Sequence, residues 1–315
     1  MRSAKFLGLL VATLAPWAHA EEVVVTTANA GNVSTGRDFA SVNGQQGAGL
    51  SFSPEQTGRV YGEIGFHTQS DSLSLGGASL ETSTTFFSFL LGGGFKVSPE
   101  VELELMLPFA FADASQTQTS GAGSLDSGDS GLAVGNLHVG ANWLKAAGPL
   151  RMKLGAALEY GPWSSDPSGI SVAALTGALA MGGLHDYGLW LPERFSIVTP
   201  SHVEFGDDFV VTADFALGLH ISTGDQDTEI SVQFDPGVGY YVSRDALLGV
   251  RLPIVAVPTG GSGDNAQIAL EPFARIGFGD GFVNLRLTMN LDEPFGFAFD
   301  DGGIWGLHVG AGGSF

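Results

Sequence analysis

The chain ends in Trp305-Gly306-Leu307-His308-Val309-Gly310-Ala311-Gly312-Gly313-Ser314-Phe315. Every second residue of this stretch, from Trp305 to Phe315, is apolar or glycine, and the positions between them hold glycine, His308 and Ser314. Successive side chains of a β-strand point to opposite faces, so the stretch predicts a strand with one apolar face and one face of small and polar residues. Such a strand fits a wall between lipid and water.

The same alternation recurs from about residue 58 to the end of the chain. In one clear case Leu103 and Leu105 share a face, and Glu102 and Glu104 share the opposite face. The pattern predicts about twelve strands, near residues 58–68, 82–97, 100–113, 131–145, 149–161, 188–204, 208–222, 228–242, 245–257, 265–279, 281–292 and 303–315. The sixth has the weakest pattern, and residues 170–184 before it fit either a short helix or a folded loop.

The fold class follows from how a membrane treats the backbone. The chain is 44% hydrophobic, yet no stretch offers the ~18 or more consecutive apolar residues that a spanning helix needs. In lipid, only helices and closed barrels satisfy all backbone polar groups internally. We therefore predict an all-β fold: a transmembrane antiparallel up-and-down β-barrel of about twelve strands with an N-terminal extension.

The end of the last strand resembles a known signal. Phe315, with Trp305, Leu307 and Val309 on the same face, resembles the C-terminal assembly signal of bacterial outer-membrane β-barrels. The resemblance implies the bacterial outer membrane as the location and outer-membrane lipid as the surroundings. It also implies that the barrel-assembly machinery binds the C-terminal strand.

The lengths of the connections predict how the barrel is oriented. Short turns are expected at Ser98-Pro99, Ala147-Gly148, Ser243-Arg244 and Asp280, whereas residues 114–130 and 162–187 form long connections. Short turns of such barrels face the periplasm and long loops face outwards. Both termini are therefore expected on the periplasmic side.

Residues 1–20 have the features of a secretory signal peptide. Arg2 and Lys5 form a basic start, residues 6–14 form a short apolar core, and Ala18-His19-Ala20 fits the cleavage pattern. We expect three parts: a signal peptide (1–20), an N-terminal periplasmic arm or lumen plug (21–57), and the outer-membrane β-barrel (58–315). The small inward residues Gly306, Gly310 and Gly312 would leave room for a plug.

Composition narrows the possible partners. Asp and Glu number 33 against 13 Lys and Arg, which gives a formal net charge of −20. Nucleic-acid phosphates require positive charge, so no nucleic-acid partner is expected. The chain has no cysteine, which excludes disulfides and thiolate metal ligands. Acidic residues in the expected loops fit either simple solubility or divalent-cation bridges to lipid head groups.

The inward positions of the expected strands carry charges of both signs. These charges fit either a polar interior held together by salt bridges, or a pore that has a transverse electric field or a binding site along it. The predicted lumen-lining residues are Glu63, His67, Glu102, Glu104, His138, Arg151, Lys153, Glu159, Asp214, His220, Glu229, Asp235, Arg251, Glu271, Arg275, Arg286 and His308. His67 and His308 should be neighbours where the first and last strands meet, but convergence on a metal cannot be read from spacing, so we predict no metal site and no cofactor.

Two segments resemble one family. Residues 130–143, which include Gly131-Leu132 and Gly135-Asn136-Leu137, resemble the Gly-Leu-Gly-Asp-Leu strand of MetA-pathway phenol-degradation barrels, with Asn136 in place of the usual Asp. Leu252-Pro253-Ile254 and Pro258-Thr259-Gly260 resemble the Leu-Pro and Pro-Thr-Gly strand end of these proteins. That family comprises outer-membrane barrels associated with uptake of aromatic compounds, so the resemblance implies a barrel and hydrophobic or aromatic cargo.

No motif supports an enzyme. The His-x-Ser-Asn-Gly motif of outer-membrane phospholipases is missing, Ser201-His202 has no orienting partner at a recognisable spacing, and Asp207-Asp208 falls in an expected turn. We predict a non-enzymatic outer-membrane channel for passive passage of small molecules, hydrophobic or aromatic ones included. The alternative is a non-catalytic outer-membrane anchor of an envelope-spanning complex with periplasmic protein partners, and a barrel enzyme ranks third.

Overall fold

The computed structural model describes residues 56–75, 78–120, 123–161, 178–179, 182–191, 193–224, 227–259, 265–292 and 303–315. The expected signal peptide and almost all of the expected arm or plug lie outside the described residues. The described part forms one antiparallel sheet of strand segments. They are β1 (Gly58–Leu75), β2 (Ala78–Ser98), β3 (Val101–Ser120), β4 (Gly123–Val134), β5 (Leu137–Ala147), β6 (Leu150–Tyr160), β7 (Arg194–Val198), β8 (Ser201–Gly206), β9 (Phe209–Ser222), β10 (Glu229–Ser243), β11 (Ala246–Arg251), β12 (Ile254–Ala256), β13 (Ala266–Phe278), β14 (Gly281–Asn290) and β15 (Ile304–Ser314).

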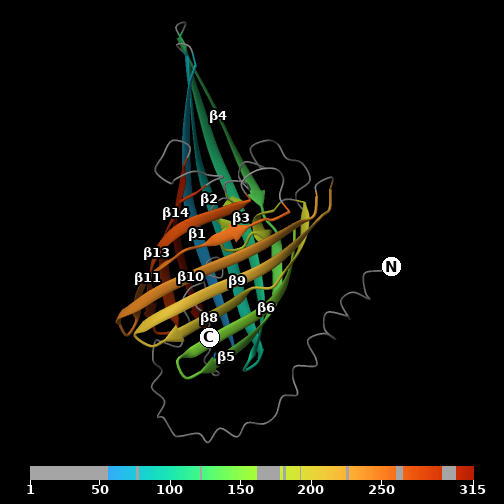
Figure 1. The fold of residues 1–315 in the computed structure, drawn as a ribbon, viewed down its shortest axis with the longest axis vertical. Helices are drawn as coiled ribbons and strands as arrows, with labels where there is room; N and C mark the ends of the chain where they lie inside the picture. The colour runs from blue at the N-terminus through green and yellow to red at the C-terminus, as the bar shows by residue number, and fades with distance from the viewer. Residues whose placement is uncertain are drawn as a thin grey trace, which may run out of the picture. The chain divides into compact units, whose positions relative to one another are not determined.

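Three pairs of segments each act as one wall strand. β4 and β5 both pair with β3, β7 and β8 both pair with β6 and β9, and β11 and β12 both pair with β10 and β13. Counted in this way, the described residues form a closed antiparallel barrel of twelve strands (Figure 1). The predicted fold class is confirmed.

The barrel closes where the sequence predicts. β15 pairs with β1 in a register that runs from Ser314 opposite Arg59 to Ile304 opposite Gln69. The backbone N–H groups of Thr57 and Gly58 both donate to the carbonyl of Phe315, at 2.7 and 3.0 Å. The last residue is thus tied directly to the start of the first strand.

Tight turns join β2 to β3, β5 to β6, β10 to β11 and β13 to β14, at the expected places. Gly148 and Gly279 occupy two of these turns with φ of 60°, a left-handed conformation that glycine adopts without steric cost. The C-terminus lies at the end of the barrel that carries the β5–β6 turn (Figure 1).

The first four strands run further than predicted. Residues 114–130, expected as a loop, are mostly strand, because β3 continues to Ser120 and β4 begins at Gly123. Figure 1 shows β2, β3 and β4 extending beyond the other strands at the end opposite the C-terminus. These extensions are rich in Ser, Thr, Gln and Gly, and they are held by cross-strand backbone pairing. Because neither face of an extension is apolar, the alternation that marks a half-buried strand stops before the strand does.

The sixth wall strand also begins later than predicted. Residues 188–190, placed in a strand by the sequence pattern, form the 3₁₀-helix η2 (Gly188–Trp190), and the strand starts at Arg194. Residues 170–184 were expected as either a short helix or a folded loop, and the structure describes 178–179 and 182–184 of them. Residues 178, 179 and 182 are helical, and the Gly183 N–H donates to the Leu179 carbonyl at 2.8 Å, which favours the short helix. No helix among the described residues is long and apolar enough to cross a membrane.

The barrel wall has two contrasting faces. On β3 the side chains of Leu103 and Leu105 are 48% and 52% exposed, whereas Glu102 and Glu104 are 1% and 2% exposed. Around the whole barrel, apolar side chains are exposed and charged side chains are buried, which is the reverse of a soluble protein. The exposed large side chains are predominantly Leu, Val, Ile, Phe and Tyr. A belt of this extent is rare on soluble proteins and typical of a surface that faces lipid.

Candidate functional site in the barrel interior

The residues predicted to line the lumen are almost all buried. The buried ones are Glu63, His67, Glu102, Glu104, His138, Lys153, Glu159, Asp214, His220, Asp235, Arg251, Glu271, Arg275, Arg286 and His308. Arg151 and Glu229 are partly buried. Their side chains form distinct networks with residues that the sequence analysis did not single out.

The first network surrounds Arg59, which the sequence analysis missed. Its guanidinium donates to Glu102 at 2.9 and 2.8 Å and to Glu104 at 2.6 Å. Asn142 donates to Glu104 at 2.8 Å, and the Lys153 ammonium lies 3.7 Å from the same carboxylate. The signal for Arg59 was present, because it lies four residues before Glu63 and therefore on the same strand face.

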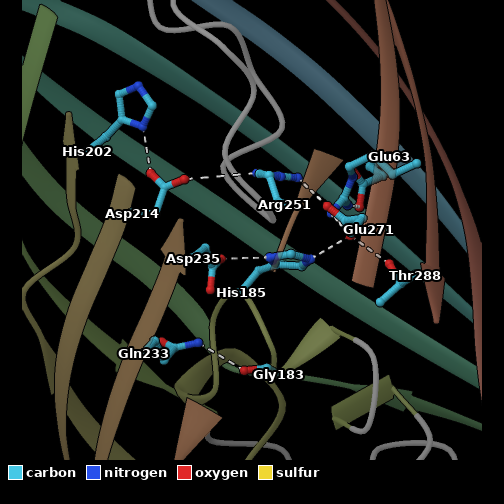
Figure 2. Close-up of polar contacts among 11 residues, drawn as sticks. Glu63, Gly183, His185, His202, Asp214, Gln233, Asp235, Arg251, Glu271 and Thr288 are labelled. Carbon is cyan, nitrogen blue, oxygen red and sulfur yellow. Dashed lines mark hydrogen bonds and ion pairs between the residues drawn. The ribbon is translucent and has the colours of Figure 1, made fainter. Parts of the chain in front are cut away.

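The second network surrounds Glu271 on β13 (Figure 2). This carboxylate accepts from Arg251, from Arg286 at 3.2 Å and from the Thr288 hydroxyl at 2.6 Å. Arg286 also donates to Glu63. These contacts join β11, β13, β14 and β1.

His67 and His308 meet at the barrel seam, as predicted. Their rings lie 4.9 Å apart, centroid to centroid, in an edge-to-face arrangement. Nδ1 of His308 lies 3.2 Å from a Glu63 oxygen, and Nε2 of His67 lies 3.0 Å from the Ser88 hydroxyl.

His202 has an orienting partner, which no recognisable sequence spacing revealed. Its Nδ1 lies 2.6 Å from Asp214 on the neighbouring strand β9, and Asp214 lies 3.9 Å from Arg251. Ser201 and His202 are successive strand residues, so their side chains point to opposite faces and do not form a nucleophile–base pair. Asp207 and Asp208 lie in the β8–β9 turn, as expected.

A connecting stretch enters the barrel interior; we call residues 182–191 the inward segment. On one side Asn136, between β4 and β5, holds it: the Asn136 side-chain amide donates to the carbonyls of Gly188 at 2.7 Å and Leu191 at 2.8 Å. The Asn136 backbone N–H donates to the Leu189 carbonyl at 2.7 Å. Asn136 is the residue at which the chain departs from the phenol-degradation pattern, and its amide supplies two donor bonds that an aspartate could not make.

On the other side His185 holds the inward segment. Figure 2 shows its ring between Asp235 of β10 and Glu271 of β13, with the two ring nitrogens 3.1 and 2.9 Å from their oxygens. Burial lowers the pKa of His185, but the charge of Glu271 and the two hydrogen bonds outweigh burial, and the pKa lies above its ordinary value. Gln233 adds a hydrogen bond of 2.9 Å to the Gly183 carbonyl.

The inward segment therefore crosses the barrel. Asn136 belongs to the fourth wall strand and Glu271 to the tenth, and these strands lie on opposite sides of a ring of twelve. No signal on the strands could have identified this segment, because its contacts join residues some 50 to 86 positions apart.

The inward segment also carries apolar side chains into the interior. Leu184, Leu189 and Trp190 are almost fully buried. They belong to one cluster with inner-face residues of the first three and last four wall strands, namely Tyr61, Phe86, Leu90, Met106, Ala110, Ala112, Val255, Ala269, Phe282 and Ile304. The interior thus contains apolar surface as well as charged side chains, whereas only the charged side chains were predicted from the sequence.

Two of the three inward glycines of β15 lie close to side chains of neighbouring wall strands. A Cβ on Gly306 would lie 2.6 Å from the His67 ring, and a Cβ on Gly312 would lie 2.8 Å from the Phe282 ring. These glycines make room for neighbouring wall side chains. A Cβ on Gly310 would meet no atom nearer than 3.5 Å. The placement of residues 21–57 as an arm or a plug stays a prediction.

One cluster links the inward segment to the wall. His138 of β5 and Glu159 of β6 are register partners, and Nδ1 of His138 lies 2.9 Å from Glu159 and 3.8 Å from Asp186. All three side chains are buried, and burial and the charge of Glu159 raise the pKa of Asp186 well above its usual range. The ligand atoms lie within 4.8 Å of one another, close enough to hold a metal ion.

No protein-family model matches this chain, and no curated protein matches it. Solved structures do. An outer membrane channel from Pseudomonas putida F1 aligns with a TM-score of 0.52 and 11% identity, over 82% of this chain and 96% of the channel. The NanC porin aligns with a TM-score of 0.46 and 7% identity over 81% of this chain and all of the porin. The translocator domain of the autotransporter NalP from Neisseria meningitidis aligns with a TM-score of 0.43 and 11% identity over 82% and 89%.

At these identities the likeness concerns the fold. The Pseudomonas putida channel supports the barrel architecture over nearly its whole length. The resemblance to the phenol-degradation family stays a prediction.

Proposed function

We propose that this protein is a bacterial outer-membrane channel for passive passage of small molecules, and that the inward segment is its gate. The observation that carries the proposal is the inward segment itself. It is held across a closed barrel by a few side chains, while the wall is held by its own networks. The apolar outer belt supports a location in lipid.

The interior also supports a class of cargo. If the inward segment leaves, it uncovers aromatic and aliphatic inner-face residues together with charged residues, several of them on the same strands. A molecule with an apolar or aromatic body and a polar group matches both surfaces. The absence of a matched catalytic motif in the sequence agrees with a channel and not an enzyme.

The remaining features of the proposal concern assembly. Residues 1–20 direct export, the strand bearing Trp305, Leu307, Val309 and Phe315 engages the assembly machinery, and both termini face the periplasm. Phe315 supports this role, since its side chain is 65% exposed at the end of the closing strand. Deletion of residues 21–57 tests whether they act as an arm or as a second plug.

A reversible cross-link tests the gate. The chain has no cysteine, so in a His185→Cys/Asp235→Cys variant a short bifunctional methanethiosulfonate reacts only at the two introduced thiols. It forms a disulfide at each with loss of methanesulfinate, and a reducing agent reverses the cross-link. The variant has lost the histidine contact, so we expect it to conduct in planar bilayers and to close when the cross-link forms. The two single-cysteine variants, treated with the same reagent, are the matched controls.

The outcomes separate channel from anchor. Conductance that disappears on cross-linking only in the double variant supports a gate. Conductance that the cross-link leaves unchanged supports a channel that the inward segment does not close. A lack of conductance in every variant, including the one without residues 21–57, would favour the anchor, which stoichiometric periplasmic partners on purification would then identify.

A further inference from the structure

The His138–Glu159–Asp186 cluster differs from the other charged networks of the interior. In the described part of the chain, the carboxylates of the two large networks are neutralised by Arg59 or by Arg286 and its neighbours. Among the residues that the structure describes, Glu159 and Asp186 have no arginine or lysine within ion-pair distance, and His138 is their only ion-pair partner. Without a cation, the two buried carboxyl groups are joined by a hydrogen bond, which requires that they share a proton. A bound cation would take the place of that proton.

An unpartnered atom points to what is missing. Oε2 of Glu159 is buried without a hydrogen-bond partner among the described residues, and Glu159 is fully buried. The inward segment makes room for this carboxylate, because a Cβ on Gly188 would lie only 1.9 Å from Oε2. The close approach is a feature of the fold and not of one flexible side chain, since the sheet register fixes Glu159 beside His138.

The spacing fits a small divalent ion. Bonds of about 2.0–2.1 Å in a tetrahedral Zn²⁺ site place ligand atoms roughly 3.4 Å apart. Nδ1 of His138 lies 2.9 Å from Glu159 and 3.8 Å from Asp186, which brackets that value. One imidazole and two carboxylates suit Zn²⁺ or a similar first-row ion, and the ion's two positive charges match the two carboxylates.

We propose that His138, Glu159 and Asp186 form a divalent-metal site of the Zn²⁺ class that fastens the inward segment to the barrel wall. Two ligands come from adjacent wall strands and the third from the inward segment, so a bound ion bridges the gate and its frame. Metal binding itself needs no conductance. The effect of the metal on conductance rests on the proposed function.

Direct binding is the test. The full mature protein, folded in detergent and stripped of metal with a chelator, is titrated with Zn²⁺ alone by calorimetry, and with Co²⁺ as a spectroscopic probe. We expect one ion per chain, and affinity at least tenfold weaker in Asp186→Asn and in Glu159→Gln. His202→Ala removes an equally buried histidine outside the cluster and should bind like the wild type.

The choice of variants guards against unfolding. Asp186→Asn changes the inward segment and no wall residue, and the heat-induced shift of a folded barrel on gels checks each variant. No Zn²⁺ binding by the wild type, or equal binding by both ligand variants and the wild type, would overturn the proposal.

A paired conductance measurement separates this proposal from the proposed function. Zn²⁺ should reduce the conductance of the wild type and leave that of Asp186→Asn unchanged. If Zn²⁺ binds as expected but no variant conducts, the metal site stands and the channel fails. If the wild type conducts but binds no Zn²⁺, the channel stands and the metal site fails.

Discussion

Replacement of His185 by alanine should open the barrel. His185 contacts Asp235 and Glu271 at 3.1 and 2.9 Å, and both acceptors belong to wall strands. After the replacement Glu271 keeps Arg251, Arg286 and Thr288, so it stays neutralised. Asp235 loses the only hydrogen bond that it makes within the described residues. The buried Asp235 then gains stability if the inward segment moves and water enters.

The size of the effect follows from these two contacts. A hydrogen bond to a charged group contributes about 1.5–3 kcal/mol. The released groups regain water, so we take the pair together as about 2–3 kcal/mol. A change of 1.4 kcal/mol shifts an equilibrium tenfold. The ratio of closed to open barrels should therefore fall roughly 30- to 140-fold.

Single-channel recording in planar bilayers measures that ratio as open probability. The matched control is His202→Ala, which removes a buried histidine that lies 2.6 Å from a carboxylate within the wall and does not touch the inward segment. An unchanged open probability in His185→Ala would refute the assignment of His185 as the latch. An equal rise in both variants would show that any loss of a buried histidine loosens the barrel.

Three further changes test the wall. Arg59→Met leaves Glu102 and Glu104 buried without their main partner and should destabilise the barrel by about 3–5 kcal/mol, which would appear as a lower temperature of the heat-induced gel shift. The control is Lys145→Met, which breaks an exposed pair with Glu100 and should cost no more than about 1 kcal/mol. Leu105→Arg on the outer face should cost about 2–4 kcal/mol and reduce the yield of membrane-inserted protein. Gln118→Arg in the extension of β3 should not reduce that yield, and equal yields of the two variants would contradict a lipid-facing belt. Phe315→Ala removes the ring that packs against Gly58 and should lower the assembled fraction in cells while detergent refolding stays normal, so unchanged assembly would argue against a signal at this residue.

The wall of this barrel could be predicted from the sequence because the alternation of apolar and polar residues involves only neighbouring positions in the chain. In a strand with one face towards lipid, residues such as Leu103 and Leu105 must be apolar, and Glu102 and Glu104 must point away. The same rule gave the register partner of the last strand. It failed at residues 114–130, where both strand faces are polar and backbone pairing alone maintains the strand.

The position of the inward segment could not be predicted, because it depends on contacts between residues that lie far apart in the sequence. Asn136 contacts Gly188 and Leu191, and His185 contacts Glu271, across large separations in the chain. Neither element shows periodicity at these positions, and the residue types serve many other roles. The alternation of side chains along the strands placed His138 and Glu159 on the inner face. The third member of their cluster, Asp186, lies on no strand.

The distribution of the contacts argues for a movable gate in a rigid frame. Arg59, Arg251 and Arg286 are buried and bind carboxylates on other wall strands, so these ion pairs do not depend on the inward segment. Buried ion pairs are costly to break, since each unpaired charge would stay desolvated. The inward segment is held by hydrogen bonds from Asn136 and Gln233, by the contacts of His185 with two wall carboxylates, and by the packing of its apolar side chains. Water can replace the hydrogen bonds once the lumen fills. If the inward segment acts as the proposed gate, the free energy between closed and open barrels should depend mainly on the contacts of this segment.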